Sequence, residues 1–412
     1  MLILLLAMVS AYGEYQSIHD LKNLDYIVVS PAGPDDGGNY GPNTPGTTTS
    51  GIQEALDYAR QNGRAVYIVG GPSAGGENGV VTYYLNETLC VPWGQQFHLD
   101  GGEYRLVYTP NTGDAVFIEG QGNSYIKFGT IIGGKSPGQV VVRLKPTVIG
   151  PDVQINCHAA RFEFDGIVGS GGMPSGAPQD NTGIGILMDG TLGASGVQNN
   201  NFYFGQITSC QIGLYLKTKV RNNTFNFPCF HNLDTAIQVG ENGTTETVAG
   251  NMFTGIISSC NRGVRVFGKE NIFMLSLDTL LPQQAFIFEA PAYNNMLISS
   301  YIPQGFTDNT NANLSNRVIT SKSIGYSVAT PSIPASGNYV VNNNSFSVEV
   351  QILTSGNVTQ WLKADSTGYS GVSDSQTFNG GFTVGQRIVL DPGFKLKLTY
   401  STPPTWRWMR LD

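Results

Sequence analysis

The fold of this 412-residue chain is decided by a repeated stretch: NFYFGQITSCQIGLYL (201–216), NTFNFPCFHNLDTAIQV (223–239), NMFTGIISSCNRGVRV (251–266) and NIFMLSL (271–277). Each copy begins with an asparagine, and an aromatic residue stands two positions later. An apolar residue stands six positions after the asparagine, and a second apolar run follows. The asparagine column is Asn201, Asn223, Asn251 and Asn271, and the aromatic column is Tyr203, Phe225, Phe253 and Phe273. The apolar column is Ile207, Cys229, Ile257 and Leu277. The second apolar runs are 214–216, 237–239, 264–266 and 286–288. A fainter fifth copy begins near Asn295.

The asparagines are separated by 22, 28 and 20 residues, which is the period of a solenoid. In a solenoid, each coil buries its apolar face only by stacking on its neighbours, roughly 4.8 Å away along the axis. The sequence therefore predicts an all-β protein, a right-handed parallel β-helix with asparagine and aromatic ladders inside it.

A short helix is expected before the coils. Ser50 and Gln53 have the spacing of a capping box, and Gly63 is placed to end the helix. Ile52, Ala55, Leu56 and Ala59 fall on one helical face. Strand-like runs separated by glycine-rich turns follow at 65–69, 80–85, 96–99, 104–108 and 115–119.

This part of the chain resembles the pectate-lyase-like β-helix superfamily. The shared pattern is an acidic-Gly loop, a short helix with Ile-Gln-x-Ala, a strand, a Tyr before Thr-Leu-x-Val-Pro, and a closing Gly-Gly. The matching positions are Asp35, Asp36 and Gly37; Ile52, Gln53 and Ala55; 66–68; Tyr84, Thr88, Leu89, Val91 and Pro92; and Gly101 and Gly102. The match covers about 70 residues and specifies architecture rather than substrate.

The resemblance implies activity on polysaccharides, either by hydrolysis with paired carboxylates or by elimination with a basic residue and a calcium-bound uronate. Polygalacturonase-type hydrolases carry Asn-Thr-Asp, Asp-Asp, Gly-His-Gly and Arg-x-Lys on successive coils. That set of motifs is not found on the coils of this chain, which argues against that subfamily.

The coil pattern is lost after about residue 331, and alternating strands are expected at 345–353, 358–364, 382–390 and 395–400. These predict a small antiparallel, β-sandwich-like domain at 332–412, after a capped β-helix at 14–331. The domain holds Trp361, Trp406 and Trp408, and Pro403-Pro404 places the last two in a terminal tail. These tryptophans are candidates for stacking on sugar rings or for packing into a subunit interface, and the alternative is that they form the core of the domain.

Residues 1–13 suggest a signal peptide, because an apolar run from Leu2 to Val9 is followed by small residues. The alternative is a buried first strand or helix, since eight apolar residues are too short to span a bilayer. A secreted, extracellular or cell-surface protein is therefore expected, with no membrane span. Sequons at Asn86, Asn222, Asn242, Asn313, Asn343 and Asn357 would permit glycosylation there.

The amino-acid composition limits the kinds of partner and cofactor that this chain is expected to bind. A net charge of -7 with only 13% charged residues provides no basic stripe, so nucleic acid is not expected as a partner. The five cysteines form neither a CxxC pair nor a zinc pattern, and buried free thiols are expected. No metal or other cofactor is predicted, except that Asp35 and Asp36 are candidates for binding calcium. An Asx turn explains those two residues equally well.

The repeat alignment places Ser209, His231 and Ser259 in one column and Asp234 beside Arg262 in another. Asp234 and Asp278, two coils apart, are candidates for the carboxylate pair of an inverting glycosidase, with His231 and Arg262 as further catalytic candidates. The alternatives are an exposed ion pair between Asp234 and Arg262 and a structural histidine.

Three acidic residues on earlier coils, Glu163, Asp165 and Asp189, are expected near the same groove, although turn-forming aspartates are common before glycine. Two functions are left open. The first is a secreted glycoside hydrolase or lyase, or a sugar-binding protein, acting on a polysaccharide in a lateral groove. The second is a non-catalytic cell-surface or virion spike or adhesin that assembles as a homotrimer.

Overall fold

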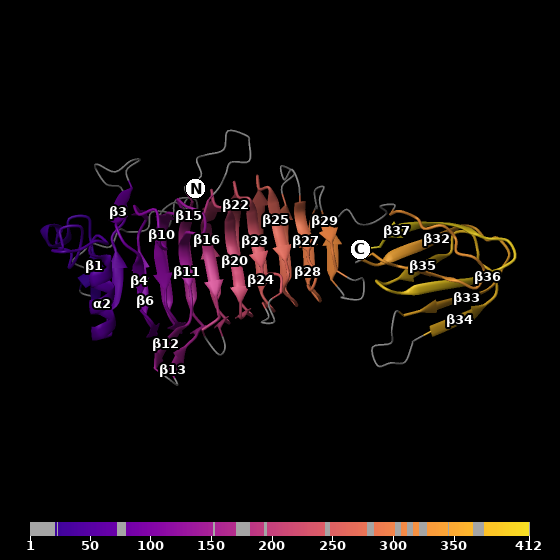
Figure 1. Cartoon of the computed structure of the whole chain (residues 1–412), viewed down its shortest axis with the longest axis horizontal. Coiled ribbons are helices and arrows are strands. Elements are labelled where there is room, and N and C mark those ends of the chain that lie inside the picture. The colour runs from indigo at the N-terminus through magenta and orange to yellow at the C-terminus, as the bar shows by residue number, and fades with distance from the viewer. Residues whose placement is uncertain are drawn as a thin grey trace, which may run out of the picture.

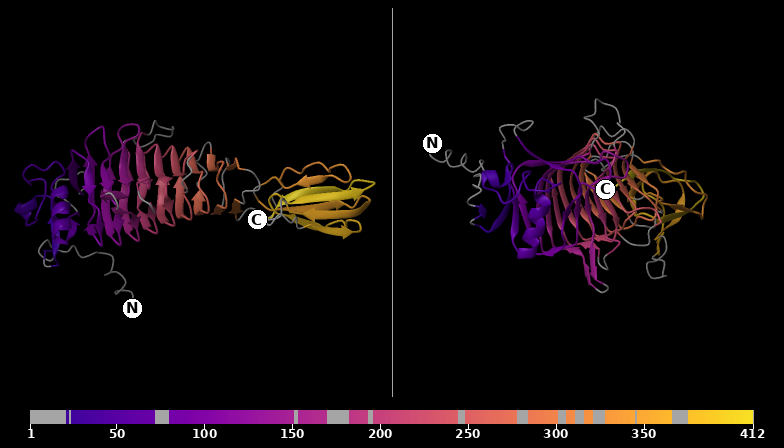
Figure 2. Two further views of the ribbon diagram at one scale, coloured as in Figure 1. Left: turned by 60° about the horizontal axis from the view of Figure 1, so that its bottom comes forward. Right: turned by 60° about the vertical axis from the view of Figure 1, so that its left-hand side comes forward.

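The computed structural model describes residues 21–22, 24–71, 80–150, 153–169, 182–192, 196–243, 248–277, 284–300, 306–310, 316–320, 328–344, 346–365 and 375–411. They form an elongated right-handed parallel β-helix, followed along its axis by a small antiparallel module (Figures 1 and 2). The predicted fold class is confirmed. The proposed signal peptide at 1–13 and Asp278 lie outside the described residues.

Three parallel sheets make the walls of the β-helix. The long sheet contains β1 (Tyr26–Val29), β2 (Ala65–Ile68), β3 (Val81–Leu85), β6 (His98–Gly101), β7 (Tyr104–Tyr108), β10 (Tyr125–Ile132), β15 (Arg161–Val168), β18 (Asn201–Phe204), β19 (Gln206–Thr208), β22 (Thr224–His231), β24 (Met252–Ser258), β26 (Ile272–Leu277), β28 (Met296–Ser299) and β30 (Arg317–Thr320). Apart from β1 and β2, which pair with each other, its strands pair with the strand one coil away rather than with their sequence neighbours, as a coil requires.

The second sheet contains β4 (Leu89–Val91), β8 (Val116–Ile118), β11 (Val140–Leu144), β16 (Ile184–Asp189), β20 (Ile212–Thr218), β23 (Thr235–Val239), β25 (Arg262–Val266), β27 (Gln284–Phe288) and β29 (Phe306–Asp308). The short sheet contains β5 (Gly94–Gln95), β9 (Gln121–Gly122), β14 (Cys157–His158), β17 (Val197–Gln198) and β21 (Val220–Arg221). An antiparallel hairpin, β12 (Thr147–Gly150) with β13 (Val153–Ile155), projects from the side of the coils (Figure 1).

A phenylalanine ladder fills the β-helix behind the long sheet. The rings of Phe162, Phe202, Phe225, Phe253 and Phe273 stack in this order with centroids 4.7–5.0 Å apart. All five side chains are buried. The ring spacing equals the strand spacing, so each ring covers the next one without displacing the backbone.

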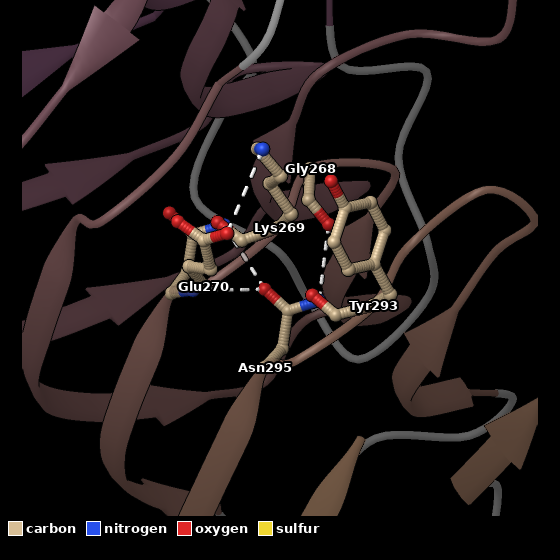
Figure 3. Close-up of polar contacts among 6 residues, drawn as sticks. Gly268, Lys269, Glu270, Tyr293 and Asn295 are labelled. Atoms are coloured by element: carbon tan, nitrogen blue, oxygen red, sulfur yellow. Dashed lines mark hydrogen bonds and ion pairs between the residues drawn. The ribbon is translucent and has the colours of Figure 1, made fainter. Parts of the chain in front are cut away.

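An asparagine ladder runs at the turn that precedes the long sheet. Asn200, Asn223, Asn251, Asn271, Asn295 and Asn316 are all buried. The backbone N–H and the side-chain Nδ2 of each one donate to Oδ1 of the next at 2.9–3.1 Å. Figure 3 shows this turn at Asn295, whose Nδ2 also donates to the carbonyls of Gly268 and Tyr293. The ladder thereby satisfies polar groups that the turn would otherwise bury without partners.

The predicted asparagine and aromatic columns are confirmed from the second copy onward, but in the first copy both are displaced by one residue. Asn200 belongs to the ladder, whereas Asn201 is the exposed first residue of β18. Phe202 is accordingly the ladder aromatic, and Tyr203 points outward with 39% exposure. Three consecutive asparagines, 199–201, made the register ambiguous in the sequence.

A similar displacement occurs in β22, where the pairing with β24 shifts between Phe227 and Phe230. As a result, Phe230 pairs with Ile207 and Ile257 inside the β-helix, and the predicted Cys229 does not. The second apolar runs pair as predicted, with Leu214, Ile237, Val264 and Phe286 in register.

The expected helix is α2 (Ile52–Asn62), and Gly63 ends it with φ 64°. The predicted capping box is wrong. Thr49 Oγ1 accepts the Gln53 N–H, while Ser50 is held by two hydrogen bonds to the backbone of Tyr84. The Gln53 side chain instead pairs with both backbone groups of Cys90, which ties the helix to β4.

The C-terminal module has two antiparallel sheets with their own hydrophobic core. One sheet contains β31 (Tyr339–Val341), β33 (Val358–Ala364), β34 (Ser375–Asn379) and β36 (Lys395–Tyr400), and the other β32 (Val348–Thr354), β35 (Arg387–Leu390) and β37 (Thr405–Arg410). Trp406 and Trp408 are not in a tail. They lie in β37, which pairs with β32, and both side chains are buried in the core.

All five cysteines are free thiols. Burial raises the pKa of the Cys157, Cys210 and Cys260 thiols to about 12. These three side chains therefore stay protonated at neutral pH and serve as small apolar core residues.

Replacing Asn251 by Ala is expected to lower the free energy of unfolding by roughly 2–5 kcal/mol, because several buried backbone and amide groups lose their partners. Asn201→Ala is the matched control and should change it by less than about 0.5 kcal/mol, since Asn201 is exposed. Urea unfolding measures both variants. If Asn201→Ala lowered the free energy of unfolding as much as Asn251→Ala does, Asn201 would belong to the ladder, which would contradict the register described here.

Trp408→Ala is expected to destabilise the C-terminal module by about 3–5 kcal/mol, because it empties a large part of that core. Val384→Ala, at a side chain that is 64% exposed, provides the control. Calorimetry of the full chain would record a lowered transition for Trp408→Ala alone. An unchanged transition would mean that Trp408 is not a core residue.

Candidate functional site

Three of the residues predicted as catalytic, His231, Asp234 and Arg262, lie around one corner of the coil, between the long and second sheets. His231 ends β22 and pairs in register with Thr208 and Ser258, so its predicted column with Ser209 and Ser259 is displaced by one. Asn232 occupies that column instead, bonded through its backbone to Ser209 and Ser259. Burial lowers the pKa of His231, so the ring is neutral at physiological pH.

Asp234 precedes β23, and its carboxylate accepts a hydrogen bond from Asn261 Nδ2 at 3.1 Å. Its backbone carbonyl accepts the Arg262 N–H at 2.8 Å, so the two residues are neighbours as predicted. Because Asp278 is outside the described residues, the carboxylate pair of Asp234 and Asp278 stays a prediction.

The three tryptophans predicted to bind sugar are placed differently from one another. Trp406 and Trp408 are buried, and a buried ring has no face to offer to a ligand, which corrects the expectation for both. Trp361 is half-buried, and its ring stacks on Phe378 with centroids 3.8 Å apart.

A dense group of aromatic and titratable side chains lies elsewhere, on the outer face of the long sheet in its first coils. We call it the tyrosine–carboxylate patch: Tyr26, Tyr67, His98, Asp100, Tyr125, Lys127, Arg161, Glu163, Asp165 and Tyr203. It arises because side chains alternate along β10 and β15, so that buried Ile126, Phe128, Phe162 and Phe164 leave their neighbours pointing outward.

Parallel pairing arranges the patch in two rows across the coils. His98, Tyr125, Arg161 and Asn201 are in register in one row. Lys127, Glu163 and Tyr203 are in register in the next row, which Tyr67 and Asp100 extend toward the first coils. With Tyr26 of β1, residues from six strands that are far apart in the sequence therefore meet on one surface.

The aromatic members of the patch contact one another. Tyr26 lies edge-on to Tyr67 and His98, with centroids 5.9 and 5.7 Å apart, and the His98 ring lies 5.0 Å from Tyr125. The Tyr26 hydroxyl is 3.2 Å from His98 Nε2. The guanidinium of Arg161 lies over Tyr203 at 4.7 Å from the ring centroid. The patch thus presents partly exposed rings next to hydrogen-bonding groups.

Two ion pairs hold its charges in place. Arg161 Nε lies 2.5 Å from Glu163 Oε1, and Lys127 Nζ lies 4.0 Å from Asp100 Oδ1. Burial raises the pKa of Tyr125, and the charges of Asp100 and Glu163 raise it further. Tyr125 therefore remains a neutral hydrogen-bonding group at physiological pH.

Asp165 is the unusual member of the patch. The positions beside it in β10 and after β18 are Gly129 and Gly205, and a Cβ at Gly205 would come within 2.0 Å of the Asp165 carbonyl oxygen. Since both neighbours are glycines, no side chain from those positions covers the exposed Asp165 carboxylate.

The pKa of Asp165 is raised above its usual range. The main cause is desolvation by the protein atoms packed around the carboxylate. The charges of Glu103, Glu163 and Asp100 act in the same direction, and Lys127 opposes them. A carboxyl group that holds its proton to higher pH, next to another that is paired with a cation, has the arrangement of a general acid and a general base.

Asp189 and the two acidic residues of the first loop have other roles. Burial would raise the pKa of Asp189, but hydrogen bonds from Thr191 outweigh it and lower the pKa. The Asp36 carboxylate accepts from Ser30 and from the Ala32 N–H, and Asp35 accepts from Asn43. Among the described residues, three or more His, Cys, Asp or Glu side chains nowhere gather as metal ligands would. In the same part of the chain, no helix has the length and apolarity to cross a membrane.

The class defined by these observations is a right-handed parallel β-helix protein with a titratable aromatic surface on its longest sheet. No family model matches the chain, and no curated protein matches its sequence. Solved structures similar to it include the enzymatically active domain of tailspike protein 4 of bacteriophage CBA120, with a TM-score of 0.36 and 9% identity. That match covers 88% of this chain and 66% of the tailspike domain, just under two thirds.

Two further similar structures are also phage tailspikes. The enzymatically active domain of CBA120 tailspike protein 2 has a TM-score of 0.24 and 10% identity, over 88% of this chain and 74% of that one. A mutant tailspike protein of E. coli bacteriophage HK620, in complex with a hexasaccharide, has a TM-score of 0.25 and 10% identity, over 95% and 94%. With TM-scores below 0.5 these similarities say nothing about the activity of this chain, and its fold is defined by its own three parallel sheets.

Asp165→Asn is expected to stabilise the protein at pH 7. The folded-state pKa of Asp165 lies above the usual value of 3.8, so the ionised group costs stability at neutral pH, and this cost disappears as the pH falls below that value. Thermal unfolding of the wild type and the variant at pH 7 and near pH 3.5 measures the difference. A variant that is less stable than the wild type at pH 7 would contradict the raised pKa.

Proposed function

We propose that this protein binds a polysaccharide across the tyrosine–carboxylate patch and cleaves it there by hydrolysis. The observation that carries the proposal is that Asp165, with its raised pKa, lies two residues from Glu163 on the same face of β15, and that the neighbouring strands β10 and β18 carry the outward-facing Tyr125 and Tyr203.

Asp165 is the general acid in this proposal. Its raised pKa keeps a fraction of the carboxyl group protonated under conditions in which an ordinary aspartate is ionised. A protonated carboxyl group can deliver its proton to the leaving oxygen of a glycosidic bond. Asp165 is exposed, and the positions on both sides of it are glycines, so a sugar chain would meet no neighbouring side chain there.

Glu163 is the general base. Its side chain is held in place by the ion pair with Arg161, and a carboxylate in a fixed position can accept a proton from an attacking water molecule. The α-carbons of two residues that are two positions apart on a strand lie about 6.6 Å from one another. Inverting glycosidases keep their carboxyl groups roughly 6.5–9.5 Å apart to admit a water molecule, so this spacing favours hydrolysis with inversion.

The tyrosines provide subsites on either side of the carboxylates. Tyr203 is in register with Glu163 on one side, and Tyr125 with Arg161 on the other. Flat aromatic faces pack against the apolar faces of sugar rings, while hydroxyl groups and Arg161 supply hydrogen bonds.

Asp165→Asn and Glu163→Gln are each expected to reduce hydrolysis by about 10²–10⁴-fold while leaving binding within a few-fold, because each removes one proton-transfer group. Glu270→Gln is the matched control, at an exposed carboxylate on another face of the β-helix. The assay measures new reducing ends and unsaturated products across neutral and acidic polysaccharides.

Activity in the wild type that both variants retain would exclude this pair, and unsaturated products would identify a lyase instead. In the wild type, hydrolysis should decline as the pH rises through the raised pKa of Asp165, because the acid form is then lost. Hydrolysis that increases through that range would contradict the assignment of Asp165 as the acid.

A second candidate function is a non-catalytic glycan-binding spike, exposed on a cell or virion surface and assembled as a homotrimer. The continuous phenylalanine and asparagine ladders favour it, because they make the β-helix a stiff rod that needs no catalytic site. A well-folded protein that binds polysaccharide without releasing product, and that has the mass of a trimer in light scattering, would favour this function over hydrolysis.

A further inference from the structure

The outer face of the long sheet changes its chemistry along the β-helix. From β24 onward it carries an apolar strip, which we define as Met252, Ile272, Met274, Met296 and Ile298. Ile272, Met274 and Ile298 are 39%, 37% and 37% exposed, and the two other methionines are half-buried. Exposed apolar side chains grouped in this way mark a surface that binds something.

The strip continues the two rows of the tyrosine–carboxylate patch. In the first row, Arg161 and Asn201 are followed in register by Thr224, Met252, Ile272 and Met296. In the second row, Glu163 and Tyr203 are followed by Asn226, Thr254, Met274 and Ile298. Four strand spacings separate Glu163 from Met274, roughly 19 Å, a length that an oligosaccharide of several residues spans.

We propose that the polysaccharide bound by this protein carries O-acyl esters, and that the acyl groups lie on the apolar strip. This inference rests on the proposed function, because it extends the same glycan from the patch along the same two rows.

The residues between the patch and the strip fit an ester. Thr224, Asn226 and Thr254 are half-buried, uncharged and able to donate hydrogen bonds, and they directly precede the methionines in their rows. An ester presents a carbonyl oxygen to such donors and a methyl group to the strip. A deoxy sugar presents only a methyl group and would leave these donors unused.

The lack of charged side chains on this surface also favours a neutral ester. None of the eight side chains that face outward in these two rows from β22 to β28 carries a charge. A neutral ester can cover these eight side chains, whereas a free uronate lying over them would lose hydration and would meet a cation only at the ends of the first row, at Arg161 and Arg317. Methionine adapts its shape to small apolar groups of varied outline, which suits acyl substituents.

A second copy of the chain fits this surface less well. The three exposed residues of the strip show about two fifths of their side chains each, which gives an apolar area of at most a few hundred Å². A stable interface between copies buries roughly 800 Å² on each partner. The strip is therefore of the size that a glycan segment covers.

The test measures the affinity of Asp165→Asn, which binds without turnover, for a panel of bacterial polysaccharides. Each polysaccharide is used as extracted and after mild alkali has removed its O-acyl esters. The polymer bound most tightly is expected to lose at least about fourfold in affinity on de-O-acylation, since one methyl group taken out of water accounts for that factor. Met274→Gln or Ile298→Thr is then added to Asp165→Asn, and each double variant should bind the acylated and the de-O-acylated polymer within about twofold of one another. Val384→Thr, on the C-terminal module, is the control and should leave the preference for acylated polymer unchanged.

The outcomes separate the two proposals. Binding that ignores the acyl groups overturns this inference and leaves the proposed function in place. No binding to any polysaccharide overturns the proposed function and this inference together. If both strip variants keep the preference for acylated polymer, the acyl group binds elsewhere and the assignment of the strip is overturned. A change of oligomeric state in the strip variants overturns it too.

Discussion

Everything in this β-helix depends on keeping polar backbone groups satisfied while coils stack at the strand spacing. The asparagine ladder does this at the turn before the long sheet, where each amide serves its own coil and the next one. The phenylalanine ladder fills the space behind the same sheet at the same repeat distance. Because both ladders repeat coil by coil, the backbone positions of the outer face are fixed without any contribution from outward side chains.

Because the two ladders inside the β-helix hold its backbone in place, the outward side chains of the long sheet are available for function. The early coils place tyrosines, cations and carboxylates in register, and the later coils place threonine, asparagine, methionine and isoleucine on the same two rows. A rigid sheet holds these groups in fixed positions, which is what recognition of an extended polymer requires. Asp165 is unusual in this setting, because it stands in a column that is glycine on either side.

The sequence was sufficient to predict the β-helix, the helix before it and the separate C-terminal module, since hydrophobic columns and turn residues determine these. It misplaced Asn201 and Cys229 by one residue, because consecutive asparagines and a bulge hide the register. Trp406 and Trp408 alternate with Arg407, which is a strand signal that the Pro-Pro break obscured. Glu163 and Asp165 were identified as candidates, but Tyr125, Lys127 and Arg161 were not, because coil lengths vary and no fixed spacing brings them together.

The central claim is that the glycan lies across β10, β15 and β18 on the outer face of the long sheet. The most direct measurement is a crystal structure of Asp165→Asn with a bound oligosaccharide from the polymer that the protein binds best. The account predicts sugar rings against Tyr125 and Tyr203, with a glycosidic oxygen within hydrogen-bond distance of residue 165. Sugar density at the Asp234 corner or beside Trp361 instead, with the patch empty, would contradict it.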